Sequence, residues 1–78
     1  MSITPGEFLQ KQMNMKGMTS LDLSRRLMFS HLIIDDILAD KMQIDEELAR
    51  RLWKIFGVTV DEWMKVQKDY NRSKKNEQ

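Results

Sequence analysis

The sequence contains no cysteine, one histidine, one proline and three glycines among its 78 residues. Without cysteine it can form neither a disulfide nor a thiolate metal site, which fits a reducing compartment, so we expect a cytoplasmic protein. The single histidine, together with the lack of a glycine-rich phosphate loop and of metal-ligand spacing, argues against an enzyme and against any cofactor or metal. No apolar run approaches about 18 residues, so we expect no membrane-spanning segment.

Charge is present in both signs but is unevenly distributed. The net charge of the whole chain is only +1, whereas nucleic-acid-binding domains are usually strongly basic. Residues 28–48 contain six acids and one lysine, a net −5, so the rest of the chain carries +6. Apolar residues make up 41% of the sequence, which is enough for one small folded domain.

Helix start and stop signals divide the chain into five segments. Thr4 and Thr19 each precede an acidic residue by three positions, which is the capping-box pattern. Gly17 and Gly57 suit the left-handed position that ends many helices. Between these signals apolar residues recur at helical spacing, and no alternating strand pattern competes. We therefore predict an all-α fold with helices at 4–15, 19–27, 30–39, 45–56 and 60–71.

The second and third segments have the spacing of a helix-turn-helix over 19–39. Two or three residues separate these helices, which forces a tight crossing. The positions expected to point inward are Leu23, Leu27, Ile34 and Ile37. We expect a single domain over 1–72 and a disordered tail over 73–78, because the tail has no apolar residue to bury.

Three phrases of the sequence carry a family resemblance. They are TPGEFLQ, MTSLDLSRRL and IDEELARRLWKIFGVTVDEWMKVQKDY, and together they span roughly Thr4 to Tyr70. They resemble the HigA-type antitoxins of the XRE (VapI) family, which show a TPGEFL-like start and a closing phrase similar to ALRLAKxFGTSPEFWLNLQxxYD. The resemblance implies a five-helix, lambda-repressor-like DNA-binding domain, usually dimeric, that represses its own operon. It also implies a partner, a small toxin that is commonly an mRNA-cleaving nuclease.

The chain departs from the family pattern within the helix-turn-helix itself. The tight turn that the family builds from Gly-Val is Met28-Phe29 here, and a left-handed Met would cost about 1 kcal/mol. The family phrase SRSTISRLLNG corresponds to residues 30–40, whose outward set becomes His31, Leu32, Asp35, Asp36 and Ala39. Carboxylates on this face oppose the release of counterions that supplies most DNA affinity.

Two sets of residues are therefore candidates for binding. The first set can donate to phosphates or to base edges, and consists of Ser20, Arg25, Arg26, Ser30, His31 and Lys41. The second set is acidic or apolar, suits a protein partner, and consists of Leu32, Asp35 and Asp36. For both sets, an ordinary solvated helix surface is the alternative interpretation.

Two functions remain open at this point. The first is a HigA-like, XRE-family transcriptional regulator that binds operator DNA as a homodimer and acts as the antitoxin of a toxin–antitoxin pair. The second is a degenerate helix-turn-helix whose acidic, apolar third helix binds a protein partner instead of DNA. The family resemblance favours the first, and the chemistry of the third helix favours the second.

Overall fold

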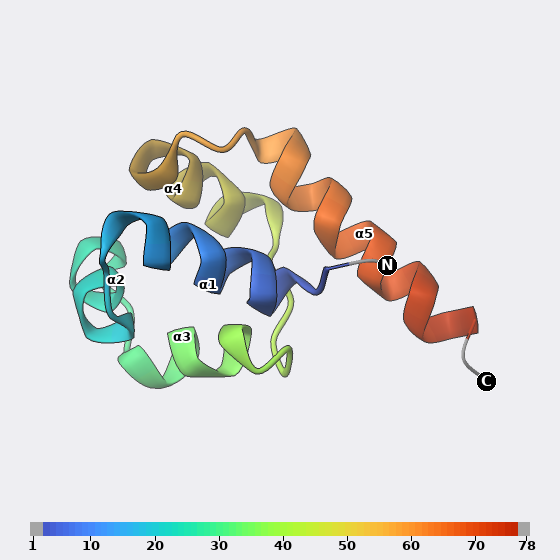
Figure 1. Ribbon diagram of the computed structural model, residues 1–78, viewed down its shortest axis with the longest axis horizontal. Coiled ribbons are helices and arrows are strands. Elements are labelled where there is room, and N and C mark those ends of the chain that lie inside the picture. The colour runs from blue at the N-terminus through green and yellow to red at the C-terminus, as the bar shows by residue number, and fades with distance from the viewer. Residues whose placement is uncertain (1–2, 77–78) are drawn as a thin grey trace.

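A computed structural model describes residues 3–76, and this part of the chain folds into five α-helices without a strand (Figure 1). The helices are α1 (Pro5–Lys16), α2 (Ser20–Leu27), α3 (His31–Leu38), α4 (Glu46–Phe56) and α5 (Val60–Asn76). The predicted all-α fold is confirmed. The predicted starts of the first four helices fall on their cap residues, one position before the first helical residue.

Side-chain caps determine where α1 and α2 begin. The hydroxyl of Thr4 accepts from the backbone N–H of Glu7 (3.1 Å), and the Glu7 carboxylate accepts from the N–H of Thr4 (3.2 Å). Thr19 and Asp22 make the same reciprocal pair at 3.1 Å in both directions. Both predicted capping boxes are therefore formed, and each satisfies two N–H groups that a helix start leaves without partners.

Left-handed residues follow the first four helices. Gly17 and Gly57 end α1 and α4 with φ of 65° and 75°, as the sequence predicted. Met28 and Asp40 adopt φ of 59° and 61° without being glycine. Asp40 occupies the position at which the family phrase ends in glycine, and its carboxylate accepts from the N–H of Gly6 at 2.8 Å. This bond joins the end of α3 to the start of α1.

The start of α1 also packs directly against the last residues of α3. A Cβ atom at Gly6 would overlap the carbonyl oxygens of Ile37 and Leu38, so this approach requires glycine. Helix α1 contacts α3 on one side and α5 on the other, and α2 packs on α3 (Figure 1). The position of α3 is therefore fixed by α1 and α2 together.

One apolar core lies among the helices. Its buried members are Leu9, Met13, Leu23, Leu27, Ile34, Ile37, Ile44, Leu48, Ala49, Leu52 and Trp63, so the four inward positions predicted for the helix-turn-helix are all buried. Trp63 anchors α5, because its ring meets Phe8 of α1 edge-on with centroids 4.9 Å apart. Gln67, one turn further along α5, is also buried. Its side-chain oxygen accepts from the N–H of Ile44 (2.9 Å), which ties the loop before α4 to α5.

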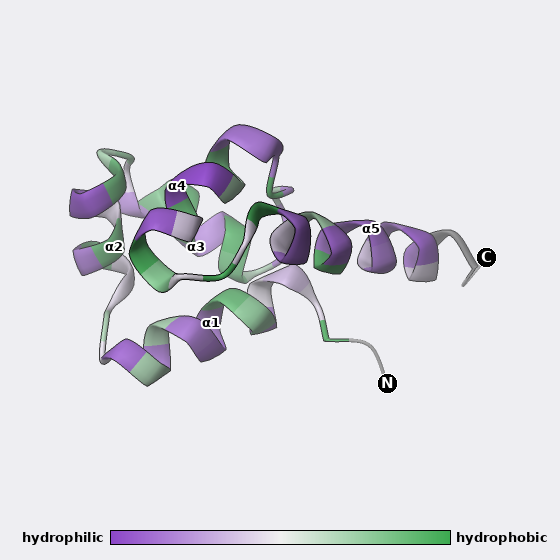
Figure 2. Cartoon of the chain, turned by 90° about the horizontal axis from the view of Figure 1, so that it is seen from above, coloured by the Kyte–Doolittle hydropathy of each residue, from purple (hydrophilic) through white to green (hydrophobic). Residues whose placement is uncertain are grey.

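The last helix is longer than predicted. The sequence indicated an end near residue 71 and a disordered tail over 73–78, but α5 continues through Asn76. Propagating a helix costs little once its first turns are packed, so polar residues can extend it. Its C-terminal part projects beyond the other helices and is largely hydrophilic (Figures 1 and 2). Residues 77 and 78 lie outside the described residues, and the domain limit at residue 72 stays a prediction.

Candidate nucleic-acid interface

Helices α2 and α3 meet through a turn of three residues, Met28, Phe29 and Ser30. Met28 reverses the chain in the left-handed conformation, and Phe29 packs half-buried against the core. Ser24 is buried where the two helices cross, and its hydroxyl donates to the Leu21 carbonyl at 2.7 Å. The buried hydroxyl is thus satisfied, and the helix-turn-helix geometry is retained although Met28 and Phe29 replace Gly-Val in the turn.

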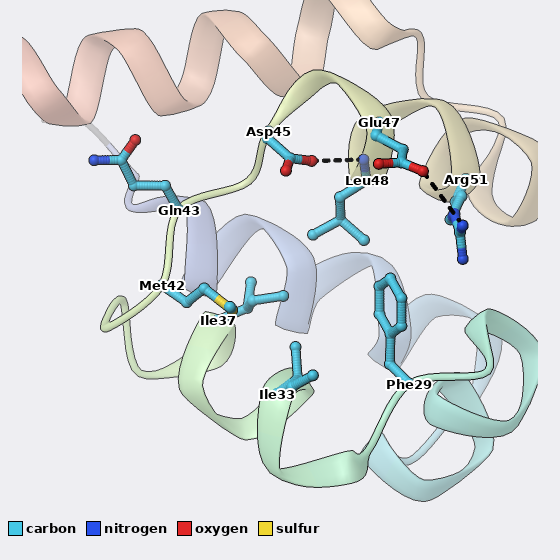
Figure 3. A pocket seen from close by; sticks show the side chains of 9 residues that line it. All are labelled: Phe29, Ile33, Ile37, Met42, Gln43, Asp45, Glu47, Leu48 and Arg51. Carbon is cyan, nitrogen blue, oxygen red and sulfur yellow. Dashed lines mark hydrogen bonds and ion pairs between the residues drawn. The ribbon is translucent and has the colours of Figure 1, made fainter.

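Arg51 of α4 packs against this turn (Figure 3). Its Nη1 donates to the carbonyl oxygen of Leu27 at the end of α2 (3.2 Å), and its guanidinium lies 5.0 Å from the centroid of the Phe29 ring. Its Nη2 is 3.5 Å from a carboxylate oxygen of Glu47. Arg51 is not among the residues that the sequence singled out. The arginine in the family's closing phrase was the signal that could have singled it out.

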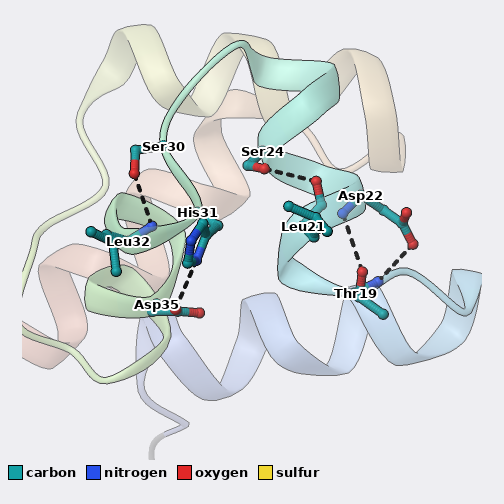
Figure 4. Close-up of polar contacts among 8 residues, drawn as sticks. All are labelled: Thr19, Leu21, Asp22, Ser24, Ser30, His31, Leu32 and Asp35. Atoms are coloured by element: carbon teal, nitrogen blue, oxygen red, sulfur yellow. Dashed lines mark hydrogen bonds and ion pairs between the residues drawn. The ribbon is translucent and has the colours of Figure 1, made fainter.

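The six predicted DNA-contacting residues lie on α2, on the first turn of α3 and in the loop after α3. Ser20 is half-buried, and the other five are exposed: Arg25, Arg26, Ser30, His31 and Lys41. Ser30 caps α3 by accepting from the N–H of Leu32 (3.2 Å), which leaves its own O–H available to a ligand (Figure 4). Of the predicted site residues, the structure brings His31 and Asp35 together, since His31 Nδ1 lies 3.6 Å from Asp35 Oδ2.

The outward face of α3 is acidic and apolar, as predicted. Asp35 and Asp36 are exposed, and Leu32 is 63% exposed. Phe29 and Ile33 are half-buried and pack against the core, so they are not part of this outward face. The surface that α3 offers to a ligand therefore consists of one large apolar side chain among carboxylates.

Three exposed cations, here called the marginal cations, flank α3 in sequence: Arg25, Arg26 and Lys41. Arg25 and Arg26 occupy the last turn of α2, where they also favour the charged form of Asp22. The pKa of the Asp22 carboxyl is lowered mainly by the backbone N–H of Thr19, then by the Thr19 hydroxyl, with the two arginines adding smaller effects. In the described part of the chain, no three acidic or histidine side chains are grouped to hold a metal ion.

No residue arrangement on this surface resembles a reaction centre, and no helix in the described residues is long and apolar enough to cross a membrane. The geometry offers a shallow ligand-binding face built from α2 and α3. This face can donate hydrogen bonds from Ser30 and the marginal cations, and it can accept them at Asp35 and Asp36.

Two solved structures are similar to this chain over most of its length. One is an addiction module antidote protein of the HigA family from Coxiella burnetii, which is 30% identical, covers 91% of this chain and 79% of its own, and has a TM-score of 0.80. The other is PA4674 from Pseudomonas aeruginosa in complex with its 18-bp operator DNA, which is 27% identical, covers 95% of this chain and 81% of its own, and has a TM-score of 0.85. No protein-family model and no curated protein matches the chain.

The structural likeness spans the helix-turn-helix and the flanking helices together, and at 30% identity it reaches beyond fold to family. It confirms the predicted family and the prediction that the chain is not an enzyme. The sequence phrases, the five helices and the solved relative agree: the chain belongs to the HigA family of addiction module antidote proteins.

Proposed function

We propose that this protein binds operator DNA as a homodimer in the cytoplasm, through α2 and α3, and neutralises a toxin as its antidote. The observation that carries the proposal is the likeness to PA4674, a protein solved on its operator, over 95% of this chain at a TM-score of 0.85. A helix-turn-helix places its second helix in the major groove, and α3 is that helix here.

Base readout in this arrangement falls to the first turn of α3. The hydroxyl of Ser30 can donate to a base or a phosphate, and His31 exposes its ring beside it. Leu32 suits the methyl group of a thymine, and Asp35, one turn further, can only accept hydrogen bonds, from the amino group of a cytosine or an adenine. The operator is therefore expected to be read through few direct contacts.

Affinity in this arrangement depends on the cations at the margins. Arg25, Arg26 and Lys41 are exposed and can reach phosphates, and Ser20 can donate its hydroxyl at the start of α2. Each phosphate contact contributes about −0.9 to the slope of log K against log salt. Three such contacts give a slope of roughly −3 for each protomer, which is shallow for an operator-binding protein.

The proposal is tested by fluorescence anisotropy on a duplex from the region upstream of the protein's own gene, at several salt concentrations. Arg25→Ala, Arg26→Ala and Lys41→Ala should each weaken binding and reduce the salt slope by about 0.9 for each protomer. Lys65→Ala, which removes an exposed cation from α5, is the matched control and should leave the slope unchanged. Absence of binding to any duplex at about 50 mM salt and micromolar protein would refute DNA binding.

The homodimer and the toxin are tested separately. A dimer that places two copies of α3 on one face of DNA requires half-sites about 34 Å apart, so a half-site spacing changed by five base pairs should abolish cooperative binding. Sedimentation equilibrium measures the dimer itself. Co-expression with the neighbouring reading frame measures neutralisation, and unchanged growth arrest in the presence of this protein would exclude the antidote role.

A second function is favoured by the outward face of α3. Leu32 is 63% exposed and lies one turn before Asp35 and Asp36, and an exposed apolar side chain beside carboxylates suits a protein partner better than DNA. If α3 binds a protein, Asp35→Lys and Leu32→Asp should each abolish its capture in a pull-down while leaving the helical circular dichroism unchanged. Capture that persists in both variants would eliminate this alternative.

A further inference from the structure

A pocket of about 200 Å³ lies between α3 and α4 (Figure 3). We call it the α3–α4 pocket. Its apolar floor is formed by Phe29, Ile33, Ile37 and Leu48. Its rim carries the carboxylates of Asp45 and Glu47. The floor is thus apolar, and the rim has one sign of charge apart from Arg51.

Asp45 is held in place as a helix cap, Glu47 makes an exposed ion pair, and both carboxylates still have acceptor capacity. Asp45 caps α4 by accepting from the N–H of Leu48 through Oδ1 (2.8 Å), and Glu47 contacts Arg51 through Oε1 (3.5 Å). Within the described residues, Asp45 Oδ2 and Glu47 Oε2 accept no hydrogen bond. Two carboxylate oxygens at the rim are therefore free to receive donors from a ligand.

The charge around the pocket selects the class of ligand. The charged residues that line the pocket are Asp45, Glu47 and Arg51, a net −1, and residues 28–48, which supply all of the lining except Arg51, carry a net −5. A phosphate at the rim would be repelled by Asp45 and Glu47, whereas a cation would be attracted. Charge complementarity therefore points away from nucleic acid and toward a basic polypeptide.

The pocket already shows how such a cation would be held. Arg51 lies over the ring of Phe29 and reaches Glu47, so one guanidinium uses the same apolar surface and the same rim. Long basic side chains commonly lay their aliphatic stems on apolar surface and keep their charged ends at a polar edge. A second such side chain from outside the molecule would find the remaining floor at Ile33, Ile37 and Leu48.

We propose that the α3–α4 pocket binds a basic segment of a protein partner, with the stem of an arginine on the apolar floor and its guanidinium at Asp45 and Glu47. This site lies on the α4 side of α3, away from Leu32 and Asp35, and does not depend on the proposed DNA binding. It gives the acidic region of the chain a ligand of opposite charge.

The probe is a blocked hexapeptide of alternating arginine and leucine, titrated into the full ¹⁵N-labelled chain. Its counterpart contains citrulline, a neutral isostere, in place of arginine. The arginine peptide should shift the amide resonances of Ile33, Gln43, Glu47 and Leu48. The double variant D45N/E47Q removes the rim charges, and asparagine retains the helix cap. It should bind the arginine peptide about threefold to tenfold more weakly, as expected for the loss of two exposed ion pairs.

The matched control is D61N/E62Q, which also removes two acidic charges near a helix start, but in the first turn of α5. It should bind the arginine peptide as the unmodified chain does. Equal weakening in both double variants, or equal binding of the citrulline peptide, would show unspecific charge attraction and overturn the proposal. The proposal would also be overturned if duplex DNA shifted the same amide resonances and bound less tightly to D45N/E47Q than to the unmodified chain. Concentration-dependent shifts of these amides without peptide would assign the pocket to a second copy of the chain.

Discussion

Met28 adopts φ 59° between α2 and α3, and its side chain is 89% exposed. A side chain in the left-handed region is strained by its Cβ atom, and an exposed methionine gains little packing to offset that strain. The turn forms nevertheless, because the N–H of Met28 donates to the Ser24 carbonyl and the helices on either side are buried. The strain is therefore local and is tolerated by the rest of the domain.

Replacing Met28 with glycine should stabilise the protein by about 1 kcal/mol, since glycine adopts this conformation without strain. Urea denaturation followed by circular dichroism measures the change. Met15→Gly is the matched control, because Met15 is also exposed but is helical, and glycine there should destabilise by roughly 0.5–1 kcal/mol. A destabilised Met28→Gly variant would show that the turn depends on the methionine side chain.

Asp40 also has a left-handed backbone, but a hydrogen bond of its side chain offsets the strain. Its φ is 61°, and its carboxylate accepts a hydrogen bond from Gly6 at the positively polarised start of α1. The aspartate thus provides an interaction between elements that a glycine at this position could not supply. Two non-glycine residues in one helix-turn-helix region therefore have the same strain with different consequences.

At the scale of elements, α4 supports the turn that orients α3. Arg51 donates to the last carbonyl of α2 and lies over Phe29, so one side chain of α4 contacts both sides of Met28. Among the described residues, the neighbouring Arg50 pairs only with Glu46 of the same helix, with Arg50 Nη2 and Glu46 Oε1 2.7 Å apart. The two adjacent arginines therefore have different structural roles.

Arg51→Ala should lower the free energy of unfolding by about 1 kcal/mol, because it removes a charged hydrogen bond and a cation–π contact that are both partly exposed. Hydrogen exchange at the Phe29 amide, which donates to Ser24, should accelerate in parallel. Arg50→Ala should cost roughly 0.5 kcal/mol or less and leave exchange in the turn unchanged. Similar effects of the two substitutions would disprove the role given to Arg51.

At the scale of the molecule, charge is separated by region. The whole chain carries +1, but the stretch from the turn to the start of α4 carries −5, and the rest carries +6. DNA binding through α2 and α3 would bring part of the acidic region close to phosphates. The field of the acidic region therefore acts against the cations at its margins, and removing part of it should strengthen attraction to DNA.

The double variant D35A/D36A should bind unrelated duplex DNA more tightly, by roughly threefold for each charge removed at low salt. Its net charge rises from +1 to +3. D61A/E62A has the same net charge but alters α5, so it should show a much smaller gain. Anisotropy titrations compare the two, and equal gains would mean that only the total charge matters and not its position on α3.

Local signals predicted the helices well because each signal acts within one turn. The caps at Thr4 and Thr19, the glycines at 17 and 57 and the helical spacing of apolar residues all concern neighbours in sequence. The end of α5 was predicted poorly, since polar residues beyond the packed part neither require nor forbid a helix. Five of the six DNA candidates lie on the helix-turn-helix and Lys41 follows it, but their contacts with DNA stay predictions.

By itself, the sequence determined the all-α fold, the buried stripe of the helix-turn-helix and the family, because periodicity, caps and characteristic phrases are local properties of the chain. The tertiary structure decided which side chains from distant segments meet. It placed Arg51 against the turn, Asp40 against the start of α1, and Phe29 and Ile33 under a pocket rimmed by Asp45 and Glu47. These contacts depend on how helices pack, and helix packing depends on side chains far apart in sequence.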